Sequence, residues 1–177
     1  MCQYRPETAA DRAAVEAVHR AAFPTDDEAE LVAALRESEA FVPDLSIVAD
    51  DGGRVVGHVL FTEVSVTAGD AGSDAAHSDA ALTLAPVAVH PDRQGEGIGS
   101  DLVRHGLAAC AAAGYDLVVL HGDPAFYSRF GFEPATPYGL DHPFKLPDED
   151  FQVRWLGEER DERIGGRVTY DAAFLDL

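Results

Sequence analysis

The amino-acid sequence predicts an α/β protein of the α+β kind, in which helices cover both faces of one mixed sheet. Residues 98–113 carry apolar side chains at helical spacing, and residues 116–120 form the short, fully apolar strand expected in a doubly covered sheet. An apolar run over 82–90 precedes the helix, so this strand–helix–strand unit requires a right-handed crossover and parallel pairing. The other strands can pair antiparallel, as the hairpin signal at 50–53, Asp-Asp-Gly-Gly, indicates.

The first half of the chain is predicted to form a short strand, two helices and a hairpin. Thr8 or Asp11 can cap the first helix, and Asp26 or Asp27 can begin the second. Strands follow near 45–50 and 54–66. The apolar positions expected to pack the two helices are Ala14, Val15, Val18, Ala21, Ala22, Leu31, Val32 and Leu35.

The second half begins with small, polar residues at 67–80, which are expected to form an exposed loop. A short helix near 124–130 and strands near 151–156 and 166–170 are predicted to complete one domain over 1–177. The helix at 98–113 is expected to bury Ile98, Leu102, Gly106, Ala109, Cys110 and Ala113.

The charge balance is strongly acidic. The 177 residues include 32 acidic and 13 basic side chains, for a formal net charge of -19, and Lys145 is the only lysine. Such a charge repels nucleic acid and anionic membranes, so neither is an expected partner. Because the acidic residues are spread along the whole chain, we interpret them as a solvated, halophilic surface adapted to high salt and not as a binding tail.

Cysteine usage and hydropathy indicate a cytoplasmic protein. Cys2 and Cys110 do not suggest a disulfide framework, and no Cys/His cluster suggests a metal site. The sequence has neither an apolar signal region near its start nor a stretch of transmembrane length. We expect no metal, and a monomer or a homodimer.

A glycine-rich segment, Gln-Gly-Glu-Gly-Ile-Gly-Ser at 94–100, lies between a predicted strand and a predicted helix. Glycines let backbone N–H groups approach a ligand, and the helix N-terminus favours an anion such as pyrophosphate. A nucleotide P-loop would need a lysine, and a dinucleotide loop would need another glycine in place of Ser100 or Leu102. A tight turn without a ligand is the third interpretation.

Two motifs add a family resemblance. The segment VAVHPDRQGEGIGSDLV resembles the acyl-CoA signature of the GNAT superfamily, (Q/R)xxGxG(A/G), with Gln94, Gly97 and Gly99 at its positions. GDPAFYSRFGF resembles the second GNAT signature, an aromatic-Tyr pair before Gly-Phe, which Phe126, Tyr127, Gly131 and Phe132 match. The motif resemblance covers 82–140, and the element order agrees along the whole chain. It implies a GNAT-like, mostly antiparallel central sheet with a splayed parallel strand pair at the CoA site.

The resemblance also implies a cosubstrate, acetyl-CoA. The strand at 82–90 would bulge near Pro86 and splay from the strand at 116–120, so that its free edge pairs with the pantetheine arm. The glycine segment would wrap the pyrophosphate. Arg93 is either a CoA-phosphate ligand or a solvated loop arginine. The implied cofactor-binding residues are Val87, Ala88, Val89, Arg93, Gln94, Gly95, Glu96, Gly97, Ile98, Gly99 and Ser100.

The implied reaction is N-acetyl transfer by direct attack of a neutral amine on the thioester. Tyr127 would protonate the leaving thiolate, since a phenol with a pKa of about 10 keeps its proton at neutral pH. Glu63 is a candidate general base, with a solvated strand end as the alternative, and His121 is a weaker candidate. Where family members often carry an asparagine before the short helix, this chain has Gly122-Asp123-Pro124, so the usual side-chain contact to the CoA arm is not implied for it.

The acceptor is less determined. We expect a small-molecule primary amine, and the acidic residues at 147–151 give weak support for a cationic one. The alternative function is a non-catalytic module that binds or senses acyl-CoA, although the retained Tyr127 disfavours it.

Overall fold

The computed structural model describes residues 1–67, 77–157 and 166–175. Their strands form one mixed sheet in the order β1-β2-β3-β4-β5-β8-β6, with β9 joined to β3 and β7. The β4–β5 and β7–β9 pairs are parallel and the others antiparallel, which confirms the predicted mostly antiparallel sheet. The strands are β1 (Gln3–Pro6), β2 (Phe41–Asp51), β3 (Arg54–Thr67), β4 (His77–Val89), β5 (Leu117–His121), β6 (Glu133–Pro134), β7 (Leu140–Asp141), β8 (Phe151–Trp155) and β9 (Gly166–Thr169).

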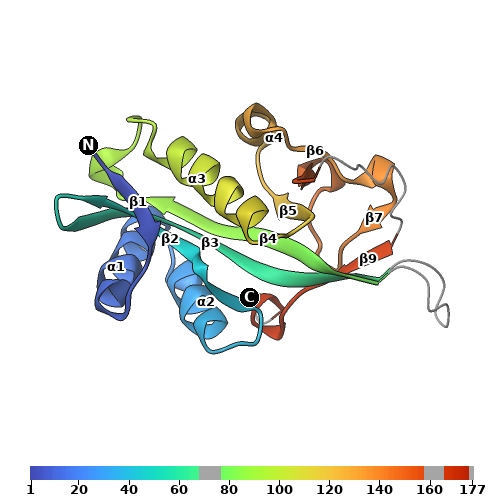
Figure 1. Ribbon diagram of the computed structural model, residues 1–177, viewed down its shortest axis with the longest axis horizontal. Helices are drawn as coiled ribbons and strands as arrows, with labels where there is room; N and C mark the ends of the chain where they lie inside the picture. The colour runs from blue at the N-terminus through green and yellow to red at the C-terminus, as the bar shows by residue number, and fades with distance from the viewer. Residues whose placement is uncertain (68–76, 158–165, 176–177) are drawn as a thin grey trace.

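Helices cover both faces of the sheet, as predicted (Figure 1). On one face α1 (Arg12–Ala22) and α2 (Asp27–Arg36) bury Val15, Val18, Leu31, Val32 and Leu35, all of them predicted core positions, whereas Ala21 is exposed. On the other face lie α3 (Ile98–Ala112) and the short α4 (Pro124–Tyr127). Among the described helices, none is both long and apolar enough to span a bilayer.

Close packing holds α3 on the sheet. A Cβ on Gly106 would overlap the Phe61 ring, so the missing side chain allows the helix to approach β3. Ile98, Leu102, Gly106 and Cys110 are buried as predicted, and Val103 and Leu107 widen the stripe. The prediction for Ala113 is wrong, because α3 ends at Ala112 and Ala113 is exposed beyond it.

Two strands begin earlier than the sequence predicted. β2 begins at Phe41, and β4 begins at His77 because the pairing with β3 extends to Thr67. Residues 77–80 are therefore strand and not loop, since ladder hydrogen bonds do not require apolar side chains. The rest of the predicted exposed loop, 68–76, lies outside the described residues.

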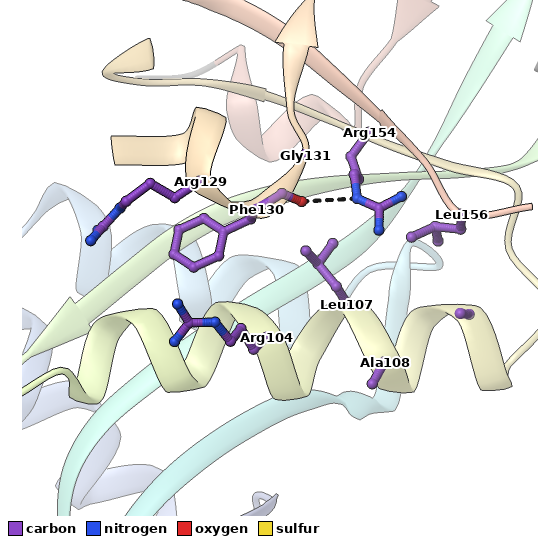
Figure 2. A pocket seen from close by; sticks show the side chains of 9 residues that line it. Arg104, Leu107, Ala108, Arg129, Phe130, Gly131, Arg154 and Leu156 are labelled. Carbon is purple, nitrogen blue, oxygen red and sulfur yellow. Dashed lines mark hydrogen bonds between the residues drawn. The ribbon is translucent and has the colours of Figure 1, made fainter. Parts of the chain in front are cut away.

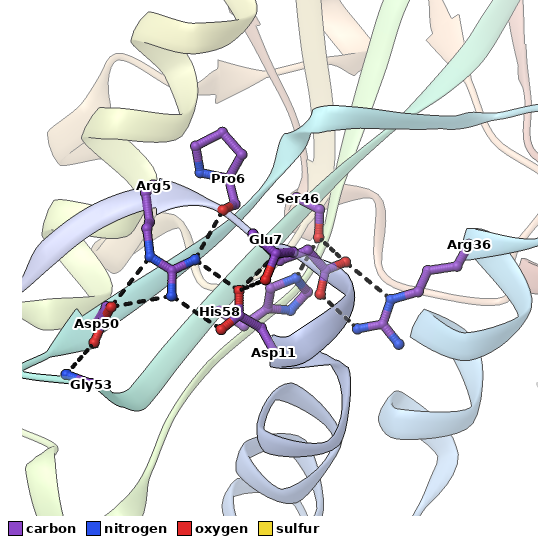
Figure 3. A network of polar contacts seen from close by, with 10 residues as sticks. Arg5, Pro6, Glu7, Asp11, Arg36, Ser46, Asp50, Gly53 and His58 are labelled. Atoms are coloured by element: carbon purple, nitrogen blue, oxygen red, sulfur yellow. Dashed lines mark hydrogen bonds and ion pairs between the residues drawn. The ribbon is translucent and has the colours of Figure 1, made fainter.

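A chain of buried polar groups connects α1, β3, β2 and α2 on the face that carries α1 and α2, and we call it the histidine chain. Figure 3 shows its part from His58 through Ser46 and Glu7 to Arg36. His19 Nε2 lies 2.8 Å from His58 Nδ1, and His58 Nε2 lies 2.8 Å from Ser46 Oγ. The Ser46 hydroxyl donates to Glu7 (2.7 Å), which also accepts two hydrogen bonds from Arg36 (2.8 and 3.0 Å).

The direction of these bonds fixes the tautomers. Because Ser46 uses its proton on Glu7, it accepts from His58 Nε2–H, and His58 Nδ1 in turn accepts from His19 Nε2–H. In this arrangement His58 carries its proton on Nε2 alone and is neutral. Burial lowers the pKa of His19 to about 4 and lowers that of His58 well below its usual value. The histidine chain ends at His19 Nδ1, which has no hydrogen-bond partner among the described residues.

Candidate active site at the splayed strands

β4 and β5 pair in parallel over only three residues of each strand. Ala81–Thr83 pair with Leu117–Val119, whereas β4 continues to Val89 and β5 to His121. A register shift between β3 and β4 lies at the same level, between the pairs Val59–Val87 and Phe61–Leu84. These observations fit the expected bulge near Pro86, which has no N–H to donate to a neighbour. Beyond Thr83 the two strands diverge, which confirms the splay.

Beyond Thr83, the edge of β4 that is not paired with β3 carries backbone groups that face the gap between β4 and β5. His90 N–H donates to Val56 O (2.8 Å), so His90 and, two residues earlier, Ala88 turn their backbone groups toward β3. Val87 and Val89 must then point theirs toward the gap. The Gln94 side chain already donates to Val89 O (3.1 Å). Of the three predicted strand residues, Val87 and Val89 form the open edge, and Ala88 supports it.

The glycine segment leads from this edge into α3. Gly95 (φ 82°) and Gly97 (φ 84°) adopt left-handed backbone conformations that other residues rarely take. Gly97 caps α3, and the first helical hydrogen bond runs from Asp101 N to Gly97 O. The N–H groups of Ile98, Gly99 and Ser100 therefore precede the first intrahelical bond and can bind an anion.

Arg93 and Glu96 interact with each other in this segment. Arg93 Nη1 lies 2.6 Å from Asp51 Oδ2, and its Nε lies 3.0 Å from Glu96 Oε2. The guanidinium is thus shared between two carboxylates. A phosphate would have to compete with them, so a CoA contact from Arg93 stays a prediction.

Tyr127 lies at the C-terminal end of β5, on the α3 face. Asp123 caps α4 by accepting from Ala125 N–H (2.9 Å), and the Tyr127 ring contacts Phe126 and Phe132 with centroid distances of 4.9 and 5.8 Å. A Cβ on Gly122 would lie 2.5 Å from Tyr127 Cε2. A side chain at position 122 would therefore have to displace the Tyr127 ring. Burial raises the pKa of Tyr127 to about 12, so its phenol keeps its proton at neutral pH.

Glu63 lies toward the other end of β5. It pairs with Leu82, which is level with Val118, and its carboxylate lies near the Tyr115 phenol. Burial and this carboxylate together raise the pKa of Tyr115. Tyr127 instead packs beyond the last residue of β5, so the structure does not bring Glu63 and Tyr127 together.

His121, the last residue of β5, faces the opposite side of the sheet from Tyr127. Its ring stacks on Phe151 (centroids 4.8 Å apart) and meets His142 edge-on at 4.5 Å. Burial, with His142 as a second cause, lowers the pKa of His121 to about 4, and Asp148 opposes this shift. His121 is therefore neutral at pH 7, and it borders a cavity at the splay.

An arginine cleft of about 530 Å³ lies between α3 and the turn after α4 (Figure 2). Arg104, Arg129 and Arg154 line it, and Arg129 donates a long hydrogen bond to Ser100 Oγ (3.4 Å) at the glycine segment. Sequence reasoning missed this cleft. The available signal was Arg104, which lies one helical turn after Ser100 on the same helix face.

A sheet that opens beside a helix N-terminus in this way places the chain in the class of acyl-CoA-dependent N-acyltransferases. The comparisons with known proteins narrow this class. A family model described as an acetyltransferase (GNAT) domain matches residues 3–135. The chain belongs to the GNAT family of N-acetyltransferases.

Relatives cover almost the entire chain. The uncharacterized N-acetyltransferase YhbS of Escherichia coli strain K12 is 36% identical over 170 residues, which is 96% of each chain. The crystal structure of Escherichia coli YhbS in complex with CoA has a TM-score of 0.84 at 35% identity and covers 98% of this chain and 92% of its own. A GNAT acetyltransferase from Brucella melitensis in complex with acetyl-CoA has a TM-score of 0.75 at 34% identity and covers 98% of both chains.

Proposed function

We propose that the protein transfers the acetyl group of acetyl-CoA to a small-molecule primary amine. The observation that carries the proposal is the open edge of β4, which leads directly into the glycine segment and the N-terminus of α3. The open edge can form hydrogen bonds with an extended ligand such as the pantetheine arm, and the N-terminus of α3 can bind the anionic group at the end of that arm. The CoA and acetyl-CoA complexes of relatives about one-third identical support the choice of ligand.

The pantetheine arm would lie along Val87 and Val89, and the pyrophosphate would bind at the N–H groups of 98–100. The remaining phosphate of CoA, on the ribose, would bind in the arginine cleft. Arg104 and Arg129 are exposed there, in a protein whose formal net charge is -19. Clustered cations on so acidic a surface support a polyanionic ligand.

In the proposed reaction the amine nitrogen attacks the thioester carbonyl carbon, and the C–S bond then breaks. An N–H group on the open edge of β4 would stabilise the oxyanion. Tyr127 donates its phenolic proton to the departing sulfur, and the raised pKa ensures that the proton is present. Water returns a proton to the phenolate afterwards.

We assign the removal of the amine proton to His121 and leave Glu63 out of the mechanism. His121 is neutral and lies at the splay, whereas Glu63 lies near Tyr115, toward the start of β5. An imidazole of low pKa is a weak base, but the nitrogen of a tetrahedral adduct is far more acidic than a free ammonium. The proton passes from His121 to water.

Calorimetry with acetyl-CoA and a thiol-release assay with a panel of amines test the proposal together. We expect acetyl-CoA to bind and at least one amine to release CoA. His121→Asn should lower kcat/KM and leave the acetyl-CoA affinity unchanged. Binding without release by any amine would indicate the sensing module, and absence of binding would refute the CoA site.

A further inference from the structure

A second cavity, of about 400 Å³, opens at the splay from the face that carries α1 and α2. Thr83, Leu84 and Ala85 of β4 border it, and so does His121 at the end of β5. Thr83 is the last residue of β4 that pairs with β5. The cavity therefore reaches the point at which the strands diverge, and it does so from the side opposite Tyr127, which packs in the α3 core cluster.

The wall of this cavity is apolar and largely aromatic. Tyr170 contacts Phe144 and Phe174 with ring centroids 4.7 and 5.6 Å apart, and Leu31 of α2 also lines the cavity. Such a wall excludes water and favours an apolar ligand body. A flexible polyamine, with a charge every few carbon atoms, would have to desolvate those charges against it.

Two side chains that can carry a positive charge border the cavity, His121 and Lys145. His121 is neutral, and its neighbour His142 uses Nδ1 to accept from Phe144 N–H (3.2 Å), so His142 donates from Nε2 to Asp148 (3.2 Å). Lys145 is therefore the cation that borders the cavity. Its side chain is exposed and forms no ion pair or hydrogen bond with the described residues.

The position of Lys145 is informative because it is the only lysine of the chain. The preceding residue, Phe144, lies against His121 with centroids 5.6 Å apart. Lys145 thus branches from the backbone close to the end of the cavity at which an amine would react. An unpaired ammonium at that place suits an anionic group that lies next to the amine.

We propose that this cavity binds the acceptor, and that the acceptor is an α-amino acid with an apolar side chain, such as leucine or phenylalanine. The side chain occupies the aromatic wall, the carboxylate binds Lys145, and the amine lies between His121 and the thioester. This inference rests on the proposed acetyl transfer and names its substrate class. It replaces the expectation of a cationic acceptor, which depended on the acidic residues at 147–151.

The first test compares matched acceptors with wild-type protein. Leucine and phenylalanine are assayed beside their decarboxylated analogues isoamylamine and phenethylamine, and beside serine and spermidine. We expect kcat/KM for the two apolar amino acids to exceed that for each other acceptor by about tenfold or more. Higher efficiency with serine or spermidine would overturn the inference.

The second test separates the carboxylate from the apolar contact. Lys145→Gln should raise KM for leucine and phenylalanine roughly two- to tenfold, with kcat retained, and should not change KM for the decarboxylated analogues. Arg20→Gln, which removes a surface cation from α1, is the matched control and should change neither. An equal rise for both kinds of acceptor would contradict the assigned role of Lys145.

The third test concerns the apolar wall. Leu31→Phe should fill part of the cavity, raise KM for phenylalanine more than for the smaller leucine, and leave acetyl-CoA affinity unchanged. Circular dichroism checks the fold. If acetyl-CoA binds but no amine releases CoA, acetyl transfer itself is wrong and the inference fails with it. If other amines react and the apolar amino acids do not, the inference alone fails.

Discussion

Two groups of buried or half-buried histidines on the same face of the sheet differ in what surrounds them. His19 and His58 belong to the histidine chain, whereas His121 borders the cavity of about 400 Å³ and packs against His142. Burial is the largest cause that lowers the pKa of His19, His58 and His121. In each group a ring nitrogen lacks a partner among the described residues: His19 Nδ1 in one, His121 Nε2 in the other.

The difference therefore does not lie in pKa or in an unpaired nitrogen. His19 and His58 are fully buried and are hydrogen-bonded to each other and on to Ser46, whereas His121 borders a cavity of about 400 Å³ at the splay. A neutral buried histidine thus marks a ligand site only where there is space for the ligand. Changes at the splay should alter turnover, and changes to the histidine chain should alter stability.

The largest expected effect is that of Tyr127→Phe at the splay. The change keeps the ring that packs on Gly122 and removes the proton donor. We expect kcat to fall by about 10²–10⁴-fold with acetyl-CoA affinity unchanged, as is typical when a general acid is lost. Tyr115→Phe, which removes a phenol near Glu63 and away from the splay, is the control and should retain turnover. Full activity of Tyr127→Phe where chemistry limits the rate would remove this residue from the mechanism.

The next effect concerns the anion site. Gly99 has ordinary helical geometry, and a Cβ there would meet Val89 Cγ2 at 3.6 Å, an ordinary contact. Gly99→Asp should weaken acetyl-CoA binding by about tenfold or more, since a carboxylate would face the pyrophosphate. Gly99→Ala is the matched control and should bind nearly as wild type. An acidic residue in the first turn stabilises a helix, so loss of binding would not reflect loss of α3. Equal affinities in calorimetry would place the pyrophosphate elsewhere.

The histidine chain predicts acid sensitivity of the fold. His19 and His58 have folded-state pKa values below the unfolded value, so the unfolded state binds protons more readily below about pH 6.5. Stability present at pH 7 should decline as the pH falls from about 6.5 toward 4, by up to about 1.4 kcal/mol per pH unit for each such histidine. Asp11, whose pKa the Arg5 guanidinium lowers, contributes only at lower pH.

Urea denaturation at pH 7, 6 and 5 measures this decline. His121 adds to the slope in the same direction, because burial lowers its pKa as well. His121→Asn should therefore remove part of the slope, and His19→Gln should also lower stability at pH 7, because it breaks the histidine chain. A free energy of unfolding that stays flat from pH 7 to 5 would show that the buried rings are not held neutral.

The smallest expected effect is that of salt. The formal net charge of -19 opposes a polyanionic ligand, and Glu96 lies in the glycine segment itself. Raising salt shortens the Debye length from about 10 Å at 0.1 M to about 3 Å at 1 M, which screens this repulsion more than the short N–H contacts to phosphate. Acetyl-CoA affinity should rise or hold between about 0.5 and 2 M KCl. A steep loss with unchanged circular dichroism would contradict the halophilic interpretation.

Features encoded by neighbouring residues were predictable from the sequence. The glycine segment, α3, β5 and the parallel crossover follow from short-range patterns, and the two motifs indicated the family. The cavity at the splay could not be predicted in this way, because Leu31, Thr83, His121, Phe144 and Tyr170 are far apart in the chain. Only the sheet order brings them together.

The position of Glu63 illustrates the same limit. The sequence predicted that Glu63 lies late in a strand. Its position relative to the splay and its neighbour Tyr115 depend on the register between β3 and β4 and on where α3 ends. The arginine cleft and the histidine chain also join residues from three or more elements. Such long-range contacts depend on how the elements pack, which periodicity in the sequence does not report.

The contact between Gly122 and Tyr127 sets unequal mutational tolerance at two adjacent positions. A library randomised at 122 and selected for turnover should return glycine alone, because any Cβ would push the phenol aside. The same library at 123 should accept aspartate, asparagine, serine and threonine, since that position needs only an oxygen to cap α4. Two adjacent positions of one turn would thus differ in how many residue types they tolerate.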